Sequence, residues 1–161
     1  RGFPDEECEV RNTFGSNISF RRDVLEELGG FDESLGRKGD AQVQGEETEL
    51  AARMDEKYGE SVWYIPDAEV GHKVFAYRTD RQWLVKRAFW QGYSKRVMAD
   101  LVDDSGGQES DFLRKLALLF IPSRIGGLLR SPSRTKADQL VMLLVFTAAV
   151  GFGFAYGYLR Y

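Results

Sequence analysis

Three carboxylates lie within four positions of the chain, where a glycine precedes a helical pattern. Gly45 is followed by Glu46, Glu47 and Glu49. The helix dipole favours the charged form of carboxylates in a first turn, whereas crowding of like charges favours protonation of one of them. A carboxylate balanced in this way can act as a general base that takes a proton from a hydroxyl group. The cluster is therefore either a catalytic base or the ordinary negative charge of a helix N-terminus.

Other polar side chains suggest ligand binding, each with a plainer alternative. His72 is the only histidine, and its imidazole could ligate a metal or contact a phosphate, or be a structural side chain. Asn17 follows small residues that would let a ligand approach the backbone, or it is a turn asparagine. Gln91, Arg87 and Arg96 share one helical stretch, where the cations could bind phosphate or form a solvated helix face.

The elements that must position these groups alternate between helices and short strands. Helices are expected at 22–28, 46–58 and 80–101, strands at 62–65 and 68–74, and a β-capable stretch at 17–20. Gly29 with Gly30 suits a helix C-terminus, and Pro66 stops the first strand. This pattern predicts an α/β fold. Since two or three strands make no stable sheet alone, we expect residues outside this chain to complete the sheet.

The charge of the chain changes sign along its length. Residues 1–111 carry 15 Lys/Arg and 24 Asp/Glu, a net charge of -9, whereas residues 112–161 carry 7 Lys/Arg and one acidic residue, a net charge of +6. The total of -3 argues against a nucleic-acid partner. One cysteine excludes a disulfide framework and a cysteine-cluster zinc site. An acidic globular part joined to a basic, apolar part indicates a membrane surface.

An uncharged stretch near the C-terminus predicts a membrane span. Residues 139–159 contain 21 residues without a charge, and such a helix is about 31 Å long, close to the roughly 30 Å of a bilayer core. We expect a transmembrane helix at 138–160, with a buried helix of a soluble protein as the alternative. Lys and Arg on its N-terminal side predict a plasma-membrane protein whose globular part faces the cytoplasm.

A basic amphipathic stretch at 111–130 precedes the span and is typical of helices lying in the membrane interface. Packing on the globular part is the alternative. Pro122 and the Gly126-Gly127 pair are expected to break this stretch into two short helices. The polar, Gly/Ser-rich residues 103–110 are expected to be a linker after a domain at 1–102.

Two segments together resemble a known family. The first is GSNISFRRDVL at 15–25, running into LGGFDE at 28–33; the second is GEETELAAR at 45–53, followed by IPDAEVGH at 65–72. In this order they resemble the C-terminal half of the catalytic domain of family 2 glycosyltransferases, over about Gly15 to Met98. The likeness is strongest to membrane-bound members that move sugars onto lipid-phosphate carriers, including archaeal dolichol-phosphate enzymes. It implies a GT-A fold, inverting chemistry and a divalent metal, Mg or Mn.

The resemblance assigns roles to the residues singled out above. Glu47 stands where the family usually has an aspartate base and is the candidate base, with Glu46 beside it. Asn17 would line the pocket near donor sugar and acceptor, and His72 would lie at the metal–diphosphate site. The chain has no Asp-x-Asp, so the other metal ligands would lie outside it. Residues 91–96 lack the Gln-x-x-Arg-Trp signature, which argues against a polymerising synthase.

The combined expectation is a membrane-anchored transferase. It would move a hexose or hexuronic acid, with inversion, from a nucleotide sugar to a lipid-linked acceptor such as a polyprenyl or dolichyl phosphate. The chain is expected to be the acceptor-side half, inactive without the nucleotide-binding half. A non-catalytic, membrane-tethered binding or scaffold module is the alternative.

Overall fold

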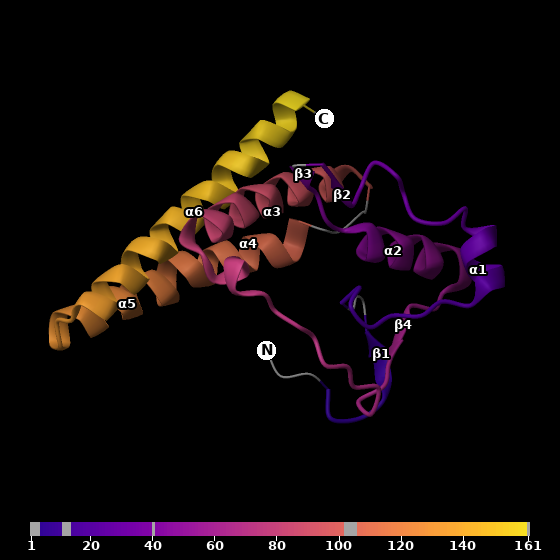
Figure 1. Cartoon of the computed structure of the whole chain (residues 1–161), viewed down its shortest axis with the longest axis horizontal. Helices are drawn as coiled ribbons and strands as arrows, with labels where there is room; N and C mark the ends of the chain where they lie inside the picture. The colour runs from indigo at the N-terminus through magenta and orange to yellow at the C-terminus, as the bar shows by residue number, and fades with distance from the viewer. Residues whose placement is uncertain (1–3, 11–13, 40, 102–105, 161) are drawn as a thin grey trace. The chain divides into compact units, whose positions relative to one another are not determined.

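The computed structural model describes residues 4–10, 14–39, 41–101 and 106–160, with the backbone alone at 38 and 106–110. The chain divides into two compact units, residues 1–76 and 77–161 (Figure 1). The described residues are mostly helical.

The described residues of the N-terminal unit form two helices and four short strands. They are β1 (Cys8–Val10), α1 (Arg22–Glu27), β2 (Arg37–Lys38), β3 (Ala41–Gln42), α2 (Glu46–Tyr58) and β4 (Val62–Tyr64). β1 pairs antiparallel with β4, with Cys8 opposite Tyr64, and β2 pairs antiparallel with β3. The described strands thus form two separate two-stranded ladders. An α/β sheet completed by residues outside this chain stays a prediction.

The strand expected at 68–74 is wrong. Residues 66–67 form a turn and residues 68–75 are irregular, as are residues 17–20. The two stretches are joined by a side chain instead, since Asn17 Nδ2 donates a hydrogen bond to the Ala68 carbonyl. Strand propensity produces a strand only where a partner completes the ladder.

The helices of this unit begin and end close to where the sequence predicts. After α1, the N–H of Gly30 bonds to the Leu25 carbonyl at 2.9 Å and the N–H of Gly29 to the Glu26 carbonyl at 3.2 Å. This is a Schellman motif, and Gly29 supplies its left-handed residue with φ 77°. α2 covers the predicted range, and Leu50 and Ala51 on its inner face are almost fully buried.

The C-terminal unit consists of helices. They are η1 (Ala76–Thr79, which begins at the unit boundary), α3 (Arg81–Leu101), α4 (Gly106–Lys115), the π-helical turn η2 (Leu116–Phe120), α5 (Ile121–Arg130) and α6 (Arg134–Arg160). Asp80 begins α3, because its Oδ1 accepts hydrogen bonds from the N–H groups of Gln82, at 2.9 Å, and Trp83, at 3.2 Å.

α3 and α6 lie side by side and run in the same direction (Figure 1). Arg81 pairs with Asp138 at 3.3 Å near the start of both helices. Glycines bring the two backbones together in the middle: a Cβ at Gly92 would overlap the Val150 carbonyl, and a Cβ at Gly153 would overlap the Phe89 carbonyl. Small residues at a helix interface allow this close approach.

The amphipathic stretch is one helical run rather than two separated helices. Gly126 and Gly127 lie inside α5, so the expected break there is wrong. Pro122 is accommodated near the start of α5, directly after the wider η2 turn. Residues 106–110 already belong to α4, which corrects the expected linker; residues 102–105 lie outside the described part.

α6 contains the predicted span of 138–160. Among the helices of the described residues, α6 alone is long and apolar enough to cross a membrane, judged by length and composition. One face, with Ala149, Gly153 and Gly157, is buried within the unit, while Val141 and Phe152 are 55% and 71% exposed. α6 therefore has one face that packs within the unit and another that is exposed.

Candidate active site

A pocket of about 480 Å³ in the N-terminal unit contains the predicted carboxylates. Three segments line it: Gly15 and Ile18 before α1, residues in the 31–37 loop, and Glu46 with Glu47 at the start of α2. Acidic groups dominate its polar lining, since the loop contributes Asp32 and Glu33, and Arg37 is the cation among the lining residues.

The start of α2 aims two carboxylates at this pocket. Gly45 is the N-cap residue with φ 118°, a left-handed conformation that side chains rarely adopt. Glu47 lies against the backbone of Gly15, where an added Cβ would overlap its carboxylate. Glu46 buries its Oε2 atom without a hydrogen-bond partner among the described residues. The predicted base and its neighbour are thus half-buried in the pocket, close to backbone from another segment.

Glu49 does not belong to this pair of carboxylates. Its place one step further into the helix predicts that it is turned towards solvent, but it is 6% exposed and accepts two hydrogen bonds from Arg53. The residue that sequence reasoning missed is Arg53. Its signal was the four-residue spacing between Glu49 and Arg53, which places them on one helix face.

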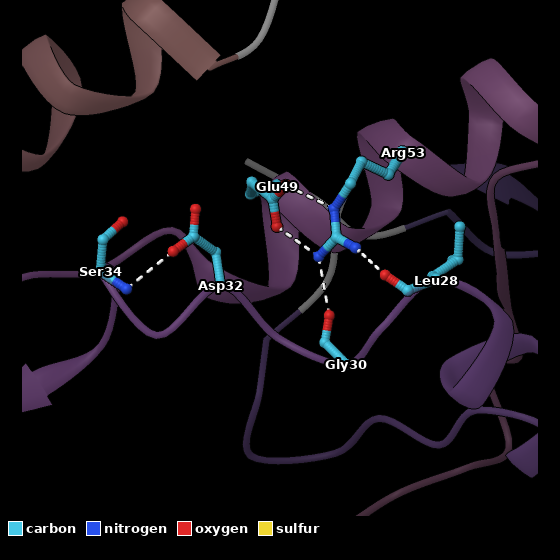
Figure 2. Close-up of polar contacts among 6 residues, drawn as sticks. All are labelled: Leu28, Gly30, Asp32, Ser34, Glu49 and Arg53. Carbon is cyan, nitrogen blue, oxygen red and sulfur yellow. Dashed lines mark hydrogen bonds and ion pairs between the residues drawn. The ribbon is translucent and has the colours of Figure 1, made fainter.

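Arg53 connects α2 to the loop that follows α1 (Figure 2). Its Nε and one terminal nitrogen bind the Glu49 carboxylate at 2.5 and 2.7 Å. The guanidinium also donates to the Gly30 carbonyl at 2.8 Å and to the Leu28 carbonyl. The hydrogen bonds that Arg53 donates to the Glu49 carboxylate raise the pKa of Arg53, against the opposing effect of burial, and the charges of Glu49 and Asp32 add to the increase. Arg53 is therefore charged at neutral pH.

Asn17 and His72 occupy two linked, exposed segments. Asn17 lies between the pocket residues Gly15 and Ile18, and its amide is engaged with Ala68, four residues before His72. The amide therefore ties the 15–20 segment to the segment that carries the histidine. Substrate contact by Asn17 stays a prediction.

The metal site expected at His72 is not assembled by these residues. Among the described residues no group of three or more His, Cys, Asp or Glu side chains could hold a metal ion. His72 is exposed. The described part of the chain therefore does not by itself fit a divalent metal, and any ligation by His72 stays a prediction.

The predicted substrate-binding residues of α3 belong to the C-terminal unit. Gln91 is exposed and Arg87 is half-buried. Arg96 pairs with Asp100 at 2.6 Å, and its guanidinium lies 4.1 Å from the centre of the Tyr158 ring of α6. With its side chain 15% exposed, Arg96 is not on a solvated helix face. Contacts of the three with substrate stay predictions.

Comparison with known proteins gives one informative match. The chain is 50% identical over 159 residues to the glucosyl-dolichyl phosphate glucuronosyltransferase of Haloferax volcanii. The match covers 99% of this chain and 51% of that protein, so the chain spans about half the length of its relative. No protein-family model matches the chain, and no solved structure matches it. The similarity points to a glycosyltransferase.

Proposed function

We propose that this chain is part of a membrane-attached, inverting glycosyltransferase of family 2 with a GT-A catalytic domain. It would transfer a hexuronic acid, or a hexose, from a nucleotide sugar to a lipid-linked acceptor. The single observation that carries the proposal is the 50% identity to a glucosyl-dolichyl phosphate glucuronosyltransferase along almost the whole chain. The pocket with Glu46 and Glu47 supports it, because acceptor activation requires a base beside a space for substrate.

On an acceptor that attacks through a sugar hydroxyl, such as glucosyl-dolichyl phosphate, Glu47 would take the proton of that hydroxyl as its oxygen bonds to the transferred sugar and the nucleoside diphosphate leaves from the opposite face. Its position against the Gly15 backbone supports this role, since the absence of a side chain at residue 15 leaves room for its carboxylate in the pocket. A divalent metal would neutralise the leaving diphosphate. The described residues do not fit a metal by themselves. The other ligands would therefore come from residues outside this chain, and we assign no reaction step to the metal.

Membrane attachment fits an acceptor on a long lipid. α6 would span the bilayer, while the η2–α5 region would lie in the interface. Leu118 and Leu129 are 68% and 76% exposed there, close in the sequence to the cations Arg124 and Arg130. Exposed apolar side chains beside basic ones suit anionic lipid surfaces. The catalytic part would then face the cytoplasm, on the side of the basic residues.

The test is sugar transfer by the full-length protein that contains this chain. Membranes with the protein would receive a nucleotide-activated glucuronic acid or hexose, Mg²⁺ or Mn²⁺, and either glucosyl-dolichyl phosphate or polyprenyl phosphate. We expect a metal-dependent glycolipid product of inverted anomeric configuration, measured by mass spectrometry and NMR. A folded protein that transfers none of these sugars would favour the binding or scaffold module.

A further inference from the structure

One guanidinium joins the two walls of the pocket. Arg53 reaches from α2 and holds the Glu49 carboxylate with two nitrogens and the carbonyls of Leu28 and Gly30 with its terminal nitrogens (Figure 2). The guanidinium therefore donates hydrogen bonds from Nε and from both terminal nitrogens at the same time. The Arg53 side chain is 30% exposed and the Glu49 side chain, taken without its backbone, is 8% exposed, so the contact is largely shielded from water.

On one side, Arg53 holds the loop that forms a pocket wall. The Gly30 carbonyl that it binds belongs to the peptide unit leading into Phe31, and Phe31 and Asp32 line the pocket. Beyond this point the loop is stiffened locally: Asp32 Oδ1 accepts from the Ser34 N–H at 2.7 Å, and the Asp32 carbonyl accepts from the Leu35 N–H at 3.1 Å. A displacement at residue 30 would therefore move the wall.

On the other side, Arg53 is anchored to the helix turn that presents the carboxylates. Glu49 lies three residues after Glu46, and its N–H bonds to the Gly45 carbonyl at 2.8 Å. Its side chain thus belongs to the same turn as Glu46 and Glu47. The Glu49 carboxylate thus orients the guanidinium, and the contacts of Arg53 with the Leu28 and Gly30 carbonyls set how far this turn stands from the 31–37 loop.

We propose that Arg53 is a positioning residue for the proposed transfer reaction, fixing the separation between the Glu46–Glu47 turn and the loop wall that contains Phe31 and Asp32. The proposal rests on the function proposed above. Lysine cannot replace this arginine, because an ammonium group is a point charge without a planar fork that matches a carboxylate and two carbonyls together. Misplacing a base by about 1 Å can cost about 10²-fold in rate.

The experiment compares Arg53→Lys with Arg21→Lys in the full-length protein. Arg21 is the matched control, since it also pairs with a carboxylate, Asp23, but that pair is 78% and 63% exposed. Four quantities are measured: kcat and KM for sugar transfer, the thermal midpoint, and hydrogen–deuterium exchange of the amides at 28–35. Glu49→Gln serves as a second variant in case Arg53→Lys does not fold.

For Arg53→Lys we expect kcat to fall about 10- to 100-fold with KM for the donor within about threefold. Hydrogen–deuterium exchange at 28–35 should rise about 10-fold, while β1 and β4 should exchange as in the parent. Glu49→Gln should likewise lower kcat and raise the exchange at 28–35. Arg21→Lys should match the parent.

Unchanged exchange at 28–35 overturns the inference whether or not the parent is active. Faster exchange with unchanged kcat also overturns it, because Arg53 is then only structural. An inactive parent contradicts the proposed function itself.

Discussion

The N-terminal unit joins its elements through polar side chains, whereas the C-terminal unit brings two helix backbones into direct contact. In the first, Arg53 ties α2 to the loop after α1, and Glu27 of α1 binds both Lys57 and Tyr58 at the end of α2, at 2.7 and 2.8 Å. In the second, α3 meets α6 at Gly92 and Gly153.

Glycine serves different purposes in the two units. Gly29 and Gly45 supply left-handed backbone at helix ends, with φ 77° and 118°, and so determine where elements turn. Gly92 and Gly153 lie within helices and matter because they have no side chain. The polar unit should therefore respond to changes in charge and hydrogen bonding, and the helical unit to changes in volume. The four predictions that follow test this contrast.

The largest effect is expected for a change of charge without a change of shape in the pocket. Glu47→Gln should lower kcat about 10²- to 10⁴-fold in the full-length enzyme, because the amide cannot accept the proton. KM for the donor should stay close to the parent value, since only a transition-state interaction is lost. Glu47→Asp should keep substantial activity. An active Glu47→Gln beside an inactive Glu46→Gln would move the base to Glu46, and equal small losses would favour ordinary helix-end charge.

The next effect concerns volume in the helix pair. Gly153→Ala should destabilise the α3–α6 contact by about 1–3 kcal/mol, because the new methyl group overlaps the Phe89 carbonyl and one helix must shift. Gly151→Ala is the matched control two residues away, where an added Cβ meets nothing within 4 Å. Unfolding in detergent, followed by helical circular dichroism, would measure the difference. Equal stability of the two variants would show that the backbones do not touch.

A smaller effect is expected from weakening the polar connection in the N-terminal unit. Glu49→Gln removes the charge that Arg53 binds and should lower the free energy of unfolding by about 1–2 kcal/mol, a value reduced for the partial exposure of Arg53. Denaturant unfolding would report this loss. The earlier expectation that Glu49 faces solvent predicts no measurable change, so the experiment separates the two descriptions.

The smallest effect is a dependence on pH at the α1–α2 contact. Hydrogen bonds from Lys57 and Tyr58 lower the pKa of Glu27 below 4.5. A carboxyl whose pKa is lower in the folded state stabilises the fold above its unfolded pKa and loses that contribution as pH falls through the folded value. We expect the stability difference between the parent and Glu27→Gln to be constant from pH 7 to about pH 5 and to shrink below 4.5. A difference that persists unchanged at pH 3 would contradict this sign.

Local patterns predicted the helices well and the strand pairing poorly. α2 and α3 begin and end within a residue or so of the expected positions, because apolar spacing and capping residues act within a few residues of the chain. The 68–74 segment had strand-like residues, yet it hydrogen-bonds through Asn17 and forms no ladder among the described residues. A ladder depends on a distant partner, which local propensity does not contain.

The amino-acid sequence by itself determined α1, α2 and α3, the uncharged span within α6, and the cluster of Glu46 and Glu47 at a helix N-terminus, since each depends on neighbouring residues. Only the tertiary structure decided what those residues face. It separated Glu49 from the other two carboxylates by pairing it with Arg53, and it placed Gly153 against Phe89. Glu49 and Arg53 are four residues apart, but the contacts of Arg53 with Leu28 and Gly30 and of Gly153 with Phe89 join segments far apart in the chain. Those distances are settled only when the elements pack.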